Sequence, residues 1–135
     1  MPPLTHVIAG CLLDEHGQLL VIKQRNSGCF TLPGGPPEHG ETPMATLARH
    51  WRTMLGAELA EESLVLLGRF RASTAEAVDE TVDADVFLVT QADMHLQADQ
   101  QQVEEIHWLA LTASETVPLS PLLIQEVLPA LHDRT

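Results

Sequence analysis

Alternating stretches of hydrophobic and polar residues divide the first third of the chain into short extended segments. HVIAGCLL and QLLVIKQ are apolar runs joined by DEHG, in which Gly17 suits a tight turn. This pattern predicts an antiparallel hairpin of residues 5–13 and 18–24. CFTL predicts a short strand that ends at Pro33. The following PGGPP, residues 33–37, predicts a rigid loop because proline fixes the backbone angle φ.

A helix is predicted directly after this loop. Thr42 is a suitable N-cap, Pro43 fits the first helical position, and Gly56 suits the residue that ends the helix. The apolar residues that recur at helical spacing, and so predict a buried face, are Met44, Leu47, Ala48, Trp51 and Leu55.

The rest of the chain predicts three strands and a closing helix. The strands are expected in SLVLLGRFR, TVDADVFLVT and EEIHWLAL, and the helix in PLSPLLIQEVLPALH with Ser120 as its cap. The order of strands, helix, strands and helix indicates the α/β class, with a mixed β-sheet flanked by helices. Because no internal repeat is visible, we expect a single domain over residues 1–135.

Composition and charge narrow the class of ligand. The 135 residues include 19 Asp and Glu against 7 Lys and Arg, a formal net charge of −12. Such a field repels polyanions, so we expect no nucleic acid polymer and no membrane as partner. A small phosphorylated ligand would need a local basic site or a bridging cation. Cys11 and Cys29 lie in apolar runs and are predicted to be core thiols.

The N-terminal segment predicts no export. MPPLTH lacks the basic start of a secretory signal, and VIAGCLL is too short to span a bilayer. A cytoplasmic location is therefore expected.

The stretch LPGGPPEHGETPMATLARHWRTMLGA resembles the signature of the Nudix hydrolases, G-x5-E-x7-R-E-U-x-E-E-x-G-U, where U is aliphatic. Gly35, Glu41, Arg49 and Gly56 match four fixed positions with every spacing intact. The preceding hairpin and the late EEIHWLAL segment also agree. The resemblance implies a Nudix-like α/β/α sandwich and hydrolysis of a nucleoside diphosphate linked to another moiety, with Mg²⁺ or Mn²⁺ as cofactor.

The metal-binding part of this signature is degenerate. The family places three glutamates at helix positions i, i+3 and i+4, which share one face and converge on divalent cations. The matching residues here are His50, Thr53 and Met54. None offers the anionic oxygen that a hard cation prefers. Activity is therefore expected to be weak or absent, and the protein to need no cofactor if hydrolysis is lost.

Two other sets of acids are alternatives. Glu58, Glu61 and Glu62 repeat the E-x-x-E-E spacing, but about 12 Å further along a helix axis and beyond Gly56. A solvated acidic connection explains this run better. The second set combines Glu38 and Glu41 with the Gly35 carbonyl as a weak metal site, with Glu104 and Glu105 from the late strand.

Structural roles compete with catalytic ones in this second set. Glu41 is expected to form an ion pair with Arg49 that holds the loop to the helix. His50 is a candidate base, or a zinc or manganese ligand together with His39. Glu41 and Glu105 complete the candidate catalytic residues.

The resemblance also implies a substrate-binding set that faces the phosphates or the base of the substrate and includes most of the scarce basic residues. Its candidate members are Gly34, Gly35, Lys23, Arg25, Arg49, Arg69 and Arg71. A solvated surface role is the alternative for each basic residue taken singly.

Three functions remain open from the sequence. The first is a divergent hydrolase with residual or rerouted metal use. The second is a non-catalytic Nudix-fold module that binds a ligand and acts as a sensor or regulatory subunit. The third is a purely structural role in dimerisation, since homodimers are common among proteins that this one resembles.

Overall fold

A computed structural model describes residues 4–25, 28–73, 81–90, 96–110 and 118–134. The strands are β1 (Leu4–Leu12), β2 (Gln18–Gln24), β3 (Phe30–Thr31), β4 (Gly34–Gly35), β5 (Leu64–Ser73), β6 (Thr81–Val89) and β7 (Val103–Ala110). The helical segments are α1 (Pro43–Leu55), a 3₁₀ turn η1 (Glu61–Ser63), a π-helical segment η2 (Leu123–Val127) and α2 (Leu128–Arg134).

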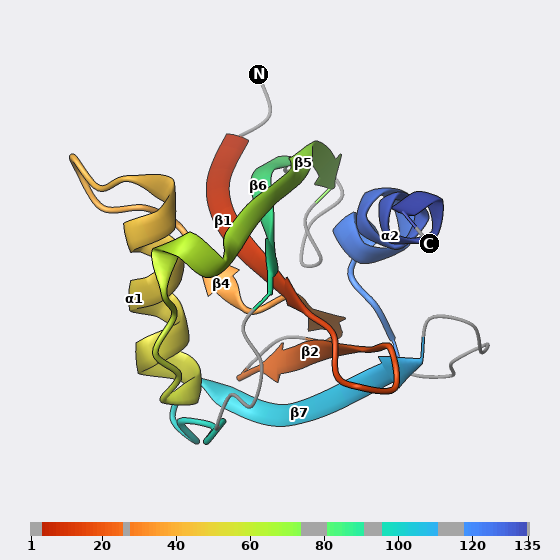
Figure 1. Cartoon of the computed structure of the whole chain (residues 1–135), viewed down its shortest axis with the longest axis horizontal. Helices are drawn as coiled ribbons and strands as arrows, with labels where there is room; N and C mark the ends of the chain where they lie inside the picture. Colours follow the sequence, from red (N-terminus) through yellow and green to blue (C-terminus); the bar gives the residue numbers. More distant parts are fainter. Residues whose placement is uncertain (1–3, 26–27, 74–80, 91–95, 111–117, 135) are drawn as a thin grey trace.

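The strands form two sheets, one of them mixed. The first sheet has the order β4-β1-β6-β5, with β1 parallel to β6 and the outer pairs antiparallel. The second has the antiparallel order β3-β2-β7. Figure 1 shows α1 and α2 on opposite sides of β1, β5 and β6, with β2 and β7 crossing below them. The predicted α/β class and flanking helices are confirmed, although the strands divide between two sheets.

The predicted hairpin of residues 5–13 and 18–24 is wrong in its pairing. Both strands exist, but β1 pairs with β4 and β6 while β2 pairs with β3 and β7. The bridge between Leu13 and Leu19 links the two runs at the turn, where Asp14 N also donates to the Gln18 carbonyl at 2.9 Å and Gly17 has φ 76°. Both runs are largely buried, so each strand packs inside its own sheet and the two do not extend as one ribbon.

Helix α1 begins and ends as its sequence predicts. The Thr42 hydroxyl accepts a hydrogen bond from Ala45 N at 3.2 Å, and Gly56 ends the helix in the left-handed region with φ 61°. Leu47, Trp51 and Leu55 are fully buried. The later helical region is also capped as predicted, since Ser120 Oγ accepts from Leu123 N.

Two apolar cores lie against the sheets. One includes the α1 residues Leu47, Trp51 and Leu55, and the other includes Leu123 and Val127 of η2. Cys11 is buried in the second core, where burial raises the pKa of its thiol to about 12. Cys29 is only partly buried, so the core prediction holds for Cys11 alone. Within the described ranges, no helix has the length and apolar character needed to span a bilayer.

Candidate functional site

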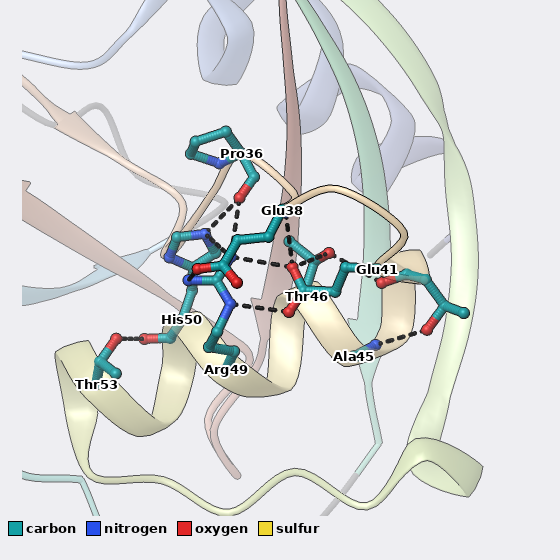
Figure 2. A network of polar contacts seen from close by, with 9 residues as sticks. Pro36, Glu38, Glu41, Ala45, Thr46, Arg49, His50 and Thr53 are labelled. Carbon is teal, nitrogen blue, oxygen red and sulfur yellow. Dashed lines mark hydrogen bonds and ion pairs between the residues drawn. The ribbon is translucent and has the colours of Figure 1, made fainter.

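The Glu41 carboxylate ties the glycine-proline loop to helix α1 (Figure 2). Oε2 accepts from Arg49 Nε at 2.8 Å, and Oε1 accepts from Arg49 Nη2 at 3.0 Å. Oε1 also accepts from Glu38 N at 3.0 Å and from the Thr46 hydroxyl at 2.9 Å. The hydrogen bonds from Arg49, more than any other cause, lower the pKa of Glu41 to about 2. The predicted Glu41–Arg49 pair is confirmed.

The His50 side chain also joins helix α1 to the loop. Its Nε2 lies 2.8 Å from the carbonyl oxygen of Pro36, which also accepts from Arg49 Nη2 at 3.2 Å. Because a carbonyl only accepts, Nε2 of His50 carries a proton and the ring donates it. Figure 2 shows both side chains reaching the same Pro36 oxygen. His50 therefore acts as a donor to the backbone at the position of a family glutamate.

The imidazole of His50 also lies directly against Gly35. A Cβ added to Gly35 would meet Cε1 of the ring at 2.5 Å and Nδ1 at 2.9 Å. Gly35 pairs with Ile8 in the first sheet, so its backbone is held in place on the other side. The missing side chain of Gly35 thus provides the space that His50 occupies.

Trp51 adds a further hydrogen bond between helix α1 and the loop. Its indole Nε1 donates to the Pro33 carbonyl at 3.0 Å, and that carbonyl also accepts from Gly10 N at 3.1 Å. The sequence predicts only the apolar packing of Trp51. Its polar role was not foreseen, although a buried indole N–H needs an acceptor. Three consecutive residues, Arg49 to Trp51, therefore hold the loop.

Thr53 and Met54 occupy the other two helix positions at which the family has metal-binding glutamates. Their side chains do not form a common site with His50. Met54 is 3% exposed and belongs to the core around Trp51 and Leu55. Thr53 is exposed, and its hydroxyl donates to the His50 carbonyl at 3.2 Å. The three positions thus present a backbone-bound imidazole, a neutral hydroxyl and a core thioether.

Lys23 and Arg25 share one acid at the end of β2. Lys23 Nζ lies 2.9 Å from Glu104, and Arg25 Nη1 lies 3.9 Å from the same carboxylate. The β2–β7 register shifts beside Lys23, which leaves Glu104 as an extra residue and brings it to this pair. The Glu105 side chain is exposed, and Glu105 lies opposite Lys23 in the ladder.

Arg69 and Arg71 lie on the other sheet. They are opposite Asp85 and Asp83 on β6, and their ion-pair distances are 3.4 Å and 3.9 Å. His6 approaches the same Asp85 at 3.5 Å. The predicted basic residues therefore lie in three separate places. Lys23 and Arg25 are at the end of β2, Arg69 and Arg71 are on β5, and Arg49 is on helix α1.

The remaining predicted acids and His39 are not gathered into a metal site. Glu38 is 71% exposed and lies 3.7 Å from Arg49 Nη1. His39 is exposed in the loop, as are Glu61 and Glu62 at the turn η1. In the part of the chain that the structure describes, no group of three or more His, Cys, Asp or Glu residues could hold a metal ion.

The family model described as the NUDIX domain matches residues 3–127. The chain belongs to the Nudix family. Its fold is similar to a MutT NUDIX hydrolase from Burkholderia pseudomallei, with a TM-score of 0.77, 23% identity and 98% of each chain covered. It is equally similar, with TM-score 0.77 and 15% identity, to the NUDIX domain of Shewanella oneidensis NrtR complexed with ADP ribose, covering 99% of this chain and 90% of that one.

One curated protein is also similar to this chain in sequence over a shorter stretch. A MutT-like protein of Streptomyces ambofaciens is 45% identical over 49 residues, which are 36% of this chain and 32% of that protein. The match thus spans about a third of the relative's length. Nudix domains bind nucleotide-like phosphorylated substrates and typically use a divalent metal.

The residues of this Nudix domain do not fit a divalent metal at the usual helix positions. Glu41 is a loop carboxylate bonded to helix α1, and its two oxygens already accept four hydrogen bonds. A hard cation would have to displace Arg49 from it. The helix itself offers no carboxylate between Pro43 and Leu55. We therefore assign no chemical step to a metal ion here.

Proposed function

We propose that this Nudix domain binds a nucleoside diphosphate linked to another moiety and hydrolyses it weakly or not at all. One observation carries the proposal: His50, Thr53 and Met54 are each engaged elsewhere, in the loop, on the helix backbone and in the core. Losing one positioned catalytic group commonly costs a hundredfold or more in rate. Three such groups are replaced here.

Ligand binding would rest on the retained loop and the basic residues. The candidates are Gly34, Gly35, Lys23, Arg25, Arg49, Arg69 and Arg71. Lys23 and Arg25 support this role best, because they lie together at the end of β2 and share a single acid. A phosphate could compete with Glu104 for both cations. Arg49 is committed to Glu41 and contributes mainly to the shape of the loop.

A sensor or regulatory module is the second candidate function. The network of Glu41, Arg49 and His50 supports this function. It holds the glycine-proline loop against helix α1 although that helix carries no acidic residue. Residual hydrolysis would instead need a rerouted base. Glu105 and His50 are the candidates for that base. Glu105 is exposed near Lys23, whereas His50 already donates one ring proton to Pro36.

Calorimetry tests binding and metal use together. We expect ADP-ribose or another nucleoside diphosphate derivative to bind with an affinity that changes little when Mg²⁺ or Mn²⁺ is removed. Arg25→Gln should weaken binding by about tenfold, the effect of one lost charge-assisted contact. Arg52→Gln is the matched control, since Arg52 is an exposed arginine of α1 outside the candidate set. Magnesium binding at low micromolar affinity to the free protein would contradict the proposal.

Activity assays with two variants separate the alternatives. If His50→Glu with Thr53→Glu gains hydrolysis that the parent lacks, the scaffold is competent and its chemistry was lost. If the parent hydrolyses and His50→Ala or Glu105→Gln abolishes turnover, a rerouted mechanism is established. Met54→Glu is made separately because it places a carboxylate in the core.

A further inference from the structure

The indole of Trp51 lies between β1 and the first residues of the glycine-proline loop. Trp51 is fully buried, and its Nε1 donates to the Pro33 carbonyl at 3.0 Å. Gly10 N on β1 donates to the same oxygen at 3.1 Å. The ring also lies against Gly10, where an added Cβ would meet Cζ2 of Trp51 at 3.0 Å. The Pro33 carbonyl is therefore held by the strand and by helix α1 together.

The Nudix signature has an aliphatic residue at the position of Trp51. An aliphatic side chain could fill part of this space, but it has no group that donates to Pro33. A buried indole N–H needs an acceptor, and here the acceptor is the Pro33 carbonyl. The tryptophan therefore adds an orienting hydrogen bond to a contact that would otherwise be apolar packing alone.

The orientation of the Pro33 carbonyl decides where the next N–H group points. The peptide bond between Pro33 and Gly34 is planar and trans, since the described residues include no cis peptide bond. In a trans peptide the carbonyl and the N–H point in opposite directions, so Gly34 N–H points away from Gly10 and Trp51.

This N–H lies at the outer edge of the first sheet. Gly34 is partly exposed and belongs to β4, which in the described part of the chain pairs with β1 alone. The outward N–H therefore has no strand partner. A Cβ added to Gly34 would meet the Ile8 carbonyl and Ala9 Cα, so the glycine backbone packs directly on β1. The donor is exposed and fixed in direction.

We propose that Trp51 is a positioning residue for ligand binding. Its indole holds the Pro33–Gly34 peptide so that Gly34 N–H donates to a phosphate oxygen of a nucleoside diphosphate, which is a charge-assisted hydrogen bond. Because the peptide is already oriented in the free protein, binding requires little reorganisation of the loop. This inference rests on the proposed function. It assigns a direct contact to Gly34 and an indirect role to Trp51.

Trp51→Phe tests the positioning role, because it keeps an aromatic ring in the core and removes the donor. We expect its affinity for ADP, measured by calorimetry, to fall by about three- to tenfold, the effect of one hydrogen bond. Trp108→Phe is the matched control, since Trp108 is partly buried on β7 in the second sheet. Its affinity should equal that of the wild type. Circular dichroism checks that both variants are folded at the temperature of the titration.

Nuclear magnetic resonance of the backbone amides separates positioning from a loss of stability. In the wild type, ADP should shift the Gly34 amide resonance and leave in place that of Gly17, in the turn between β1 and β2. This titration tests the contact even if Trp51→Phe does not fold. In a folded Trp51→Phe variant, the Gly34 amide should differ from the wild type before ADP is added.

Two results would overturn the inference alone. One is ADP binding to the wild type without a shift of the Gly34 amide, and the other is equal ADP affinity of the two phenylalanine variants. A wild type that does not bind ADP would overturn the proposed function and this inference with it.

Discussion

At the scale of single residues, Gly35 and His50 lie fifteen positions apart in the sequence and are in direct contact in the fold. The ring fills the space that a Gly35 side chain would need, and it donates to the next residue, Pro36. A histidine at this position therefore uses the glycine loop differently from a carboxylate. It binds the backbone and leaves no anion for a cation.

Gly35→Ala should destabilise the protein by about 1–3 kcal/mol through overpacking against the ring. In a His50→Ala background the same substitution should cost much less, because the obstructing ring is gone. Urea unfolding of both single variants and the double variant measures this coupling. Gly28→Ala is the control, since a Cβ there meets nothing within 4 Å. Equal costs in both backgrounds would show that the steric contact is not the cause.

At the scale of elements, the loop and helix α1 are joined by side chains from one helical turn. Arg49, His50 and Trp51 bind Glu41 and the carbonyls of Pro36 and Pro33. The helix caps at Thr42 and Gly56 fix where this turn lies along the chain. The sequence predicted the caps and the Glu41–Arg49 pair, because both depend on neighbours close in sequence. It did not predict the hydrogen bonds to proline carbonyls, whose position depends on β4.

The Glu41–Arg49 pair should make the junction of loop and helix sensitive to acid. Since the folded pKa of Glu41 is lowered to about 2 from an ordinary 4.5, its stabilisation is present above about pH 4.5 and is lost as pH falls toward 2. Glu41→Gln should lower the melting temperature at pH 7, and the difference from the wild type should shrink below pH 4.5. Melting followed by circular dichroism from pH 7 to 2.5 measures it.

Glu38→Gln is the matched control for this pH series. Its side chain is mostly exposed and only 3.7 Å from Arg49, so the substitution should change the melting temperature little at any pH. A Glu41→Gln deficit that persists unchanged at pH 2.5 would mean that the lost carboxylate charge is not responsible.

At the scale of the whole molecule, two cores flank the first sheet, and each is closed by helical segments from a different part of the chain. Cys11 lies on β1 in the core that η2 covers, with 1% of its surface exposed. Its thiol can reach solvent only when this core opens. It therefore reports on the cooperative unfolding of the molecule.

Cys11 should react with a thiol reagent at pH 8 only in proportion to the unfolded population. Burial raises its pKa to about 12 from 9.0, so the reactive thiolate is scarce in the folded state. In a Cys29→Ser variant, the labelled fraction in urea should follow the unfolding transition seen by circular dichroism. Labelling well below that transition would reveal a local opening of β1. Cys11→Ser is the control that shows how Cys29 reacts alone.

The sequence by itself determined the family, the helix from Pro43 to Leu55 with its caps, and the places of most strands. These depend on local propensity, hydrophobic period and spacing within one segment. Only the tertiary structure decided that β1 pairs with β6 and not with β2, because apolar runs buried on both faces do not specify a partner. It also decided that Met54 joins the core and that His50 binds Pro36, since each depends on residues that only the folded chain brings to the helix.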